Sequence, residues 1–224
     1  MRERLAAVYR ALGRAGLIHG NSGNLSVRWA AGMLISPSGT TPERITPESL
    51  VEMGLDAPAP RASSEWALHA ALYQDRPEIG AVVHTHSDAC TALACLGEGL
   101  PAFHYGIAGF GGDDVRCAPY VTFGTEELAR VTAEAMCGRL ACLLANHGMV
   151  AAGADLDAAV FNAETLERMC RQYLLARSAG TPRLLTAAEM GSAHERYQTY
   201  GKPAANSLCA AGAPLGHSGT DGTG

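Results

Sequence analysis

The stretch Ile79-Gly80-Ala81-Val82-Val83-His84-Thr85-His86 is a short apolar run that ends in two histidines. Its length and its β-branched residues favour a strand over a helix, since helices are usually longer. Side chains two positions apart in a strand point to the same face, so His84 and His86 should project together from the strand's end. Two imidazoles on one face can bind a single ion, although an H-x-H pair by itself is more often hydrogen-bonded scaffold.

A third histidine follows another apolar run. His147 comes after Leu143-Leu144-Ala145-Asn146 and before Gly148, which permits a tight exit from a strand. Three neutral imidazoles that leave one coordination position open describe a catalytic zinc site. The residues alone therefore indicate a metal site with His84, His86 and His147 as its ligands.

Helical and strand-like patterns alternate on both sides of these runs. Apolar residues at helical spacing predict helices over residues 5–12, 64–73, 87–96, 125–136 and 156–177. Short apolar runs predict strands over 25–29, 33–35 and 79–84, and a strand pair within 141–152. Ser63 or Ser64 is the expected N-cap of the second helix. An order of this kind predicts an α/β fold in which helices cover a sheet.

Charge and cysteine usage narrow the function classes. The 224 residues carry a net charge of −5, which argues against the clustered Lys and Arg of a nucleic-acid-binding surface. No apolar run approaches the roughly 20 residues that span a bilayer, and residues 1–5 do not look like a signal peptide. The seven cysteines include no C-x-x-C pair, so neither a disulfide framework nor a thiolate zinc site is indicated. We expect a cytoplasmic protein with no nucleic-acid or membrane partner.

The composition changes once along the chain. From residue 204 onward it is mostly Ala, Gly, Ser, Thr and Pro, with few large apolar side chains. Such a segment buries too little apolar surface to offset the entropy lost on ordering. We expect one domain over residues 1–203 and a flexible tail over residues 204–224.

At the residues singled out above, the chain resembles the class II aldolase/adducin family, most strongly its L-fuculose-1-phosphate aldolase branch. A joint match of several motifs in order is more specific than any one of them. The matching stretches, spread over most of the chain, are Gly23-Asn24-Leu25-Ser26-Val27-Arg28, Leu34-Ile35-Ser36-Pro37-Ser38-Gly39, Ser63-Ser64-Glu65-Trp66, Val82-Val83-His84-Thr85-His86, Cys117-Ala118-Pro119-Tyr120, Thr122-Phe123-Gly124-Thr125 and Asn146-His147-Gly148.

The resemblance implies a fold and a metal site. The fold is a single α/β domain whose central, mostly antiparallel sheet is covered by helices in three α/β/α layers. One Zn²⁺ per subunit, with Mn²⁺ or Co²⁺ as substitutes, is bound by His84, His86 and His147. Glu65 is implied to be both a metal neighbour in the resting state and the catalytic acid/base. From position alone, Glu65 would be read as a residue that complements the helix dipole.

The resemblance also implies how a phosphorylated sugar is bound. Tyr105 matches a catalytic tyrosine that reaches the site of a neighbouring subunit, so a homotetramer with sites at subunit interfaces is expected. Phe123 matches a wall residue on the aldehyde side, and Tyr200 matches a tyrosine that closes over substrate. Any single Ser or Gly would more often be ordinary turn chemistry. The residues implied to bind the phosphate are Gly23, Asn24, Ser38, Gly39, Ser63 and Ser64.

The implied reaction is the reversible retro-aldol cleavage of a ketose 1-phosphate to dihydroxyacetone phosphate and an aldehyde. Candidate substrates are L-fuculose, 5-deoxyribulose and methylthioribulose 1-phosphates, and the sequence leaves the aldehyde open. One alternative is a relative that epimerises or decarboxylates a phosphorylated sugar or sugar acid, although epimerases usually carry Asp where Glu65 stands. The other is a non-catalytic adducin-like assembly module, although such modules lack the metal histidines.

Overall fold

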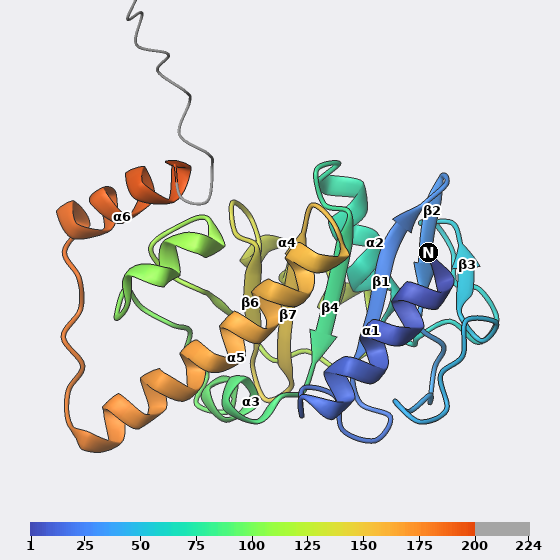
Figure 1. The fold of residues 1–224 in the computed structure, drawn as a ribbon, viewed down its shortest axis with the longest axis horizontal. Helices are drawn as coiled ribbons and strands as arrows, with labels where there is room; N and C mark the ends of the chain where they lie inside the picture. The colour runs from blue at the N-terminus through green and yellow to red at the C-terminus, as the bar shows by residue number, and fades with distance from the viewer. Residues whose placement is uncertain (200–224) are drawn as a thin grey trace, which may run out of the picture.

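A single sheet runs through the centre of the molecule (Figure 1). The computed structural model describes residues 1–199, and within this range seven strands pair in the order β3-β2-β1-β4-β7-β6-β5. The predicted boundary between residues 203 and 204, and the predicted tail, lie outside the described residues. The strands are β1 (Asn24–Trp29), β2 (Gly32–Ile35), β3 (Val51–Met53), β4 (Ala81–Thr85), β5 (Cys117–Ala118), β6 (Ala141–Leu144) and β7 (Gly148–Gly153).

Strand β4 occupies the middle of the sheet and pairs antiparallel with β1 and β7. Of the described strand pairs, β5–β6 is parallel and the others are antiparallel. The register places His84 opposite Asn24 of β1 on one side and opposite Val150 of β7 on the other. These pairings confirm the mostly antiparallel sheet, and they place the histidine-bearing end of β4 between two neighbouring backbones.

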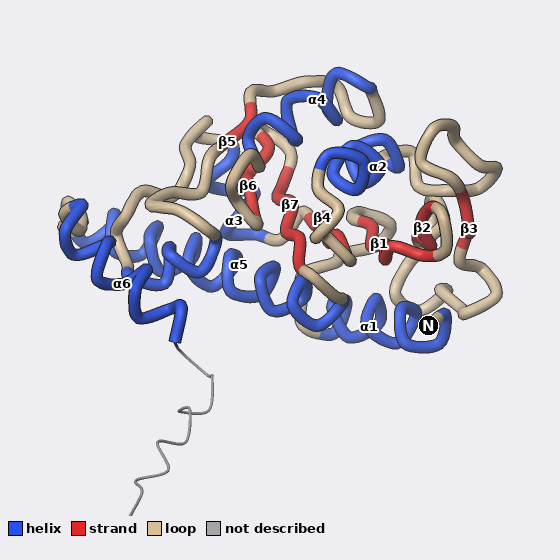
Figure 2. The backbone as a smooth tube through the Cα atoms, turned by 90° about the horizontal axis from the view of Figure 1, so that it is seen from above, coloured by secondary structure: helices blue, strands red, loops and turns tan. Residues whose placement is uncertain are grey.

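Helices cover both faces of the sheet, as Figure 2 shows from above. Helices α1 (Arg2–Arg14), α3 (Asp88–Ala94) and α5 (Leu156–Ala179) lie on one face, and α2 (Trp66–Asp75) and α4 (Glu126–Ala135) lie on the other. Alternation along β4 supplies both cores: Ala81 and Val83 pack under the first group of helices, and Val82 packs under the second. The predicted single domain with three α/β/α layers is confirmed.

Several elements differ from the sequence prediction. Helix α2 begins at Trp66 with Glu65 as its N-cap, so the prediction of Ser63 or Ser64 as N-cap was wrong. A turn precedes this helix, in which Trp66 N–H donates to Ser63 O over 3.1 Å. Ser63 and Ser64 therefore lie in the turn, and Glu65 takes the N-cap position of the helix. Elements without a clear periodic signal were missed: β3, β5, the 3₁₀ helix η1 (Tyr105–Phe110) and α6 (Ala187–Thr199).

Helix α6 packs against η1 beyond the β5 edge of the sheet, at the left of Figure 1. Among the helices of residues 1–199, none combines the length and the apolar character that a membrane crossing requires.

Candidate metal centre and active site

Three histidines converge at one end of the sheet. His84 belongs to β4, His86 follows directly after it, and His147 lies in the short turn that joins β6 to β7. The register pairs Thr85 with Met149, so the start of β7 lies beside the end of β4. The three imidazole rings therefore meet pairwise, edge to face, with centroids 4.7 to 4.9 Å apart.

Two glycines permit this close approach. A Cβ at Gly148 would lie 2.3 Å from the carbonyl oxygen of Thr85, and a Cβ at Gly23 would lie 2.8 Å from that of His84. Gly23 also has a φ of +84°, which side chains other than glycine's rarely adopt. The glycine after His147 is thus required by contact with β4, which is a different reason from the tight exit expected from the sequence.

The carboxylate of Glu65 closes the group from the start of helix α2. Its Oε2 lies 3.1 Å from His84 Nε2, and its Oε1 lies 3.2 Å from His147 Nε2. One candidate ligand atom from each of Glu65, His84, His86 and His147 lies within 4.8 Å of the others. The four residues, called the Glu–His cluster below, could hold a metal ion.

The chemistry of the cluster fits a divalent cation. Glu65 Oε1 is buried and has no hydrogen-bond partner among the described residues, and the Nε2 atoms of His84 and His86 face each other at 3.0 Å. His84 Nδ1 lies 2.9 Å from the carbonyl oxygen of Met149, which can only accept, so Nδ1 carries the hydrogen and Nε2 presents a lone pair to the cluster. Three imidazole nitrogens and one carboxylate are ligands that suit a zinc-type ion.

The ionisable groups of the cluster shift one another's pKa values. Burial lowers the pKa of His86 to about 4, helped by the neighbouring His84 and His147, so this imidazole is neutral at pH 7. Burial acts to raise the pKa of Glu65, but the nearby imidazoles of His84 and His147 outweigh it, and the net pKa lies below its ordinary value. Burial acts to lower the pKa of His84, but Glu65 outweighs it and raises this pKa, so a cation competes with a proton at His84. The cluster therefore offers an ionised carboxylate and the neutral imidazole of His86.

A cavity of about 360 Å³, called the metal-side cavity below, opens in front of the cluster and is lined by Glu65, His86 and His147. Phe123, which is 66% exposed, stands at its edge. Asn21 and Ser22, to which the sequence analysis assigned no role, also line it. The remaining walls hold all the residues predicted to bind phosphate: Gly23, Asn24, Ser38, Gly39, Ser63 and Ser64.

Asn24, which was predicted only to bind phosphate, also contacts Glu65 and His69. Its Nδ2 group donates to Glu65 Oε2 over 2.9 Å, and its Oδ1 contacts the imidazole of His69. His69 lies in α2, four residues after Glu65, and is fully buried. Residues four positions apart lie on the same side of a helix, so the spacing of Glu65 and His69 was the feature of the sequence that could have linked these two residues.

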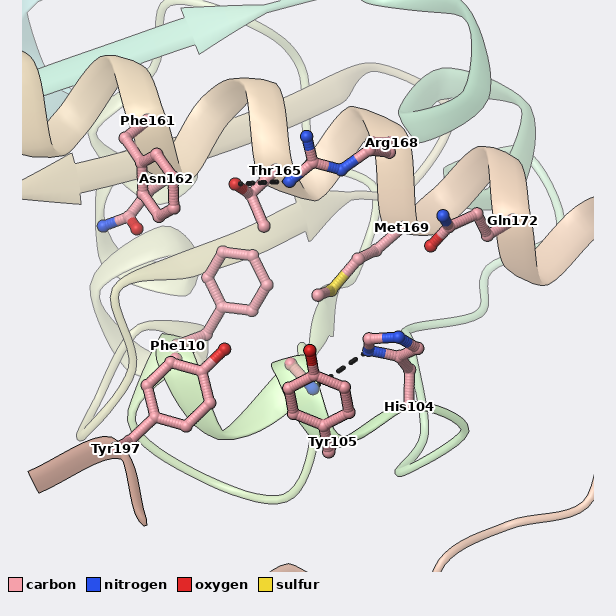
Figure 3. A pocket seen from close by; sticks show the side chains of 12 residues that line it. His104, Tyr105, Phe110, Phe161, Asn162, Thr165, Arg168, Met169, Gln172 and Tyr197 are labelled. Atoms are coloured by element: carbon pink, nitrogen blue, oxygen red, sulfur yellow. Dashed lines mark hydrogen bonds between the residues drawn. The ribbon is translucent and has the colours of Figure 1, made fainter. Parts of the chain in front are cut away.

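Tyr105 lies elsewhere in the same chain. It is 60% exposed and lines a separate cavity of about 330 Å³, the tyrosine cavity, between η1, α5 and α6 (Figure 3). Its ring stacks on His104 with centroids 4.5 Å apart. No member of the Glu–His cluster is among the described residues that line this cavity. One chain therefore does not bring Tyr105 to its own cluster, and Tyr200 lies outside the described residues.

Comparison with known proteins agrees with this geometry. The family model described as the class II aldolase and adducin N-terminal domain matches residues 3–174. The 5-methylthioribulose-1-phosphate/5-deoxyribulose-1-phosphate aldolase of Rhodospirillum rubrum is 44% identical over 204 residues, covering 90% of this chain and 92% of that protein. The L-fuculose phosphate aldolase of Escherichia coli K12 is 41% identical over 192 residues, covering 84% of this chain and 89% of that protein. A solved structure of L-fuculose 1-phosphate aldolase superposes with a TM-score of 0.83 at 40% identity, over 88% of this chain and 95% of the other.

Proposed function

Because the chain belongs to the class II aldolase and adducin family, and is therefore an aldolase and a lyase, we propose that it cleaves a ketose 1-phosphate reversibly to dihydroxyacetone phosphate and an aldehyde. The observation that carries the proposal is that residues of the Glu–His cluster line a cavity together with serines and glycines. Phosphorylated sugars are the substrates that the relatives' names state. The substrate is proposed to be L-fuculose, 5-deoxyribulose or 5-methylthioribulose 1-phosphate.

The proposed metal is Zn²⁺, held by the imidazoles of His84, His86 and His147. When bound, such an ion supplies Lewis-acid stabilisation of the negative charge that develops on the ketose oxygen during cleavage. The protein's own contribution is to aim the donor atoms, which the hydrogen bond from His84 Nδ1 to the carbonyl oxygen of Met149 does for one ring. His147 is held by its backbone in the turn after β6, where its N–H donates to Leu144 O over 3.0 Å.

Glu65 is proposed to move the proton at C3 of the three-carbon product. Its two oxygens have different surroundings: Oε2 accepts a hydrogen bond from Asn24, whereas Oε1 makes no hydrogen bond among the described residues and lies 3.2 Å from His147 Nε2. A carboxylate with one oxygen fixed by a hydrogen bond and the other without one suits a general acid/base, since the second oxygen can take and return a proton. The proton of the C4 hydroxyl is assigned to Tyr105 of a neighbouring subunit.

The phosphate is proposed to bind among Ser38, Gly39, Ser63 and Ser64, with Gly23 and Asn24. The described residues that line the metal-side cavity include no Lys or Arg. Hydroxyls and backbone N–H groups can together bind a dianion without a formal positive charge. Phe123 is proposed to contact the aldehyde portion, and Tyr200 to close over the substrate.

The proposed assembly is a homotetramer with sites between subunits. Large aromatic side chains stand exposed at both cavities: Phe123 at the metal-side cavity, and Tyr105 and Phe161, 60% and 64% exposed, at the tyrosine cavity. Exposed apolar groups around cavities support contact with another copy of the chain. A catalytically active monomer in analytical ultracentrifugation would contradict this assembly.

The catalytic domain is proposed to span residues 1–203. The six described cysteines are free thiols, which supports a reducing compartment such as the cytoplasm.

The test is a cleavage assay with the three candidate ketose phosphates, in which release of dihydroxyacetone phosphate is measured with and without chelation of the metal. We expect release from at least one substrate, its loss on chelation and its return when Zn²⁺ is added. Metal-loaded protein that released none from any of them, and condensed dihydroxyacetone phosphate with no aldehyde, would refute the proposal. An epimerase or decarboxylase would convert its substrate without releasing an aldehyde, so the same assay separates these reactions.

A further inference from the structure

A chain of buried side chains leads from the Glu–His cluster into the core beneath helix α2. Asn24 Nδ2 donates to Glu65 Oε2 over 2.9 Å, and Asn24 Oδ1 is hydrogen-bonded to His69 Nε2. On the other side of this imidazole, Nδ1 lies 2.7 Å from Ser26 Oγ, which lies 2.8 Å from the hydroxyl oxygen of Tyr73. All five residues are buried, so water does not compete for these bonds.

The direction of every hydrogen bond follows from the carboxylate. An ionised Glu65 can only accept, so the Asn24 amide must present its NH₂ group to Glu65 and its oxygen to His69. His69 Nε2 must then carry the hydrogen, because an amide oxygen cannot donate.

The same donor–acceptor reasoning fixes the remaining hydrogen bonds, from His69 to Tyr73. His69 is neutral, since burial lowers its pKa to about 3, so its Nδ1 has a lone pair and accepts from the Ser26 hydroxyl. The Ser26 oxygen in turn accepts from the hydroxyl of Tyr73. In this series of hydrogen bonds, each residue therefore donates to the neighbour that lies nearer to Glu65.

His69 does not line the metal-side cavity, so it acts on the reaction only through its neighbours. We infer that His69 is a positioning residue for the acid/base Glu65: by donating to Asn24 Oδ1 it holds the amide in the one orientation that fixes Glu65 Oε2 and leaves Oε1 for proton transfer. This inference rests on the proposed aldolase reaction, in which Glu65 moves the proton at carbon.

The physical reason is that the two ends of an amide are nearly identical in shape. Without the donor from His69, only the carboxylate of Glu65 still favours the original orientation of the Asn24 amide, and neither orientation satisfies both ends of the amide. The flipped orientation would set its oxygen against the carboxylate of Glu65, and Oδ1 in the original orientation would be buried without a partner. Glu65 would then lose its fixed orientation, although the phosphate-binding serines and the three imidazoles would stay in place.

The test compares His69→Leu, which has no donor, with His69→Gln, whose amide N–H can replace the donor at Nε2. kcat, the KM for the phosphorylated ketose, bound zinc per chain and the melting temperature are measured for each variant. Loss of a group that orients a ligand or catalytic residue typically lowers activity about 10- to 100-fold. We expect a fall of this size in kcat for the Leu variant, zinc content close to wild type, and recovery of most of kcat in the Gln variant. KM should change less than kcat, because Asn24 is only one of the six residues proposed to bind phosphate.

A matched control removes a buried hydroxyl elsewhere on the same face of the sheet. Thr132 of α4 is fully buried and donates to Leu128 O, so Thr132→Val measures the effect of a lost buried hydrogen bond on its own. It should lower the melting temperature and leave kcat unchanged. A purely structural role for His69 would give the same pattern in His69→Leu and would overturn the inference.

The same experiments distinguish a folding defect, failure of the proposed function and failure of the role of His69. If the Leu variant does not fold, His69→Gln and His69→Asn decide, because both are polar but only Gln is long enough to replace the N–H at Nε2; equal kcat values in these two would overturn the inference. If wild-type protein cleaves no ketose phosphate, the proposed function fails. If wild type is active and His69→Leu has the same kcat with zinc bound, only the role of His69 fails.

Discussion

Replacement of Glu65 by Gln separates the chemistry of this residue from its contribution to metal binding. Asn24 Nδ2 donates to Oε2, so the Gln amide must keep its oxygen at that position and place its NH₂ group at the position of Oε1. That position lies 3.2 Å from His147 Nε2 and is the one proposed to exchange a proton with substrate. An amide nitrogen there keeps the size of the side chain but can neither take nor return the proton.

The expected magnitude follows from the role that is lost. A missing general acid/base slows a reaction by about 100- to 10,000-fold, which corresponds to roughly 3 to 5 kcal/mol of transition-state free energy. Zinc should remain bound, since the three imidazoles that suffice for a catalytic zinc site are unchanged. Cleavage should therefore fall by this factor, whereas zinc content per chain should match wild type.

The decisive assay is exchange of hydrogen for deuterium at C3 of dihydroxyacetone phosphate, followed by proton NMR. This exchange requires deprotonation at carbon but no aldehyde, so it is independent of Tyr105. We expect the Gln variant to lose exchange in parallel with cleavage. If the zinc-loaded variant exchanged this hydrogen at the wild-type rate, Glu65 would not be the acid/base at carbon.

Three further predictions follow from the same site. Ser64→Asp places a negative charge in the cavity proposed to bind phosphate, so KM for the ketose phosphate should rise at least tenfold, about 1.4 kcal/mol; an unchanged KM in steady-state assays would locate the phosphate elsewhere. Gly148→Ala puts a Cβ 2.3 Å from Thr85 O, so urea unfolding should show a loss of about 1 to 3 kcal/mol and metal analysis should show reduced zinc, because His147 is displaced. Burial depresses the pKa of His69 to about 3, so the unfolded chain binds this proton below about pH 6.5 and the native one does not. The free energy of unfolding of the metal-free protein should therefore decrease as the pH is lowered below 6.5, with about 1.4 kcal/mol per pH unit from this residue. In urea unfolding, His69→Gln should show a weaker dependence of this free energy on pH.

The sequence was sufficient for the parts of this protein that depend on local pattern. The spacing of His84 and His86 at the end of an apolar run was enough to predict a strand and a shared face, because side chains in a strand alternate with a period of two. Thr125 caps α4 by accepting from Leu128 N–H over 3.1 Å, at the helix start that the pattern predicts. His147 was a third candidate ligand because it follows another apolar run. The family resemblance added Glu65, whose position in the sequence by itself indicated only a residue that complements the helix dipole.

The short elements could not be predicted from the periodicity of the sequence. Strand β5 has two residues and η1 is a single short 3₁₀ segment, so neither offers enough positions for a period to be recognised. The N-cap of α2 was also misplaced, because both serines before Glu65 have the chemistry of a cap and only the turn geometry chooses among them.

The tertiary structure alone decided how the site residues relate to one another. The antiparallel register of β4 with β7 brings His147 beside His86, and the register of β4 with β1 places Asn24 beside His84. The packing of α2 over the sheet then brings Glu65 into contact with Asn24. The same packing gives His69 its contact with Asn24 and leaves Tyr105 on a different cavity from the cluster. Periodicity determines which face a side chain occupies, but contacts between residues distant in the chain depend on register and on how helices pack over the sheet, and these are set by the whole core at once.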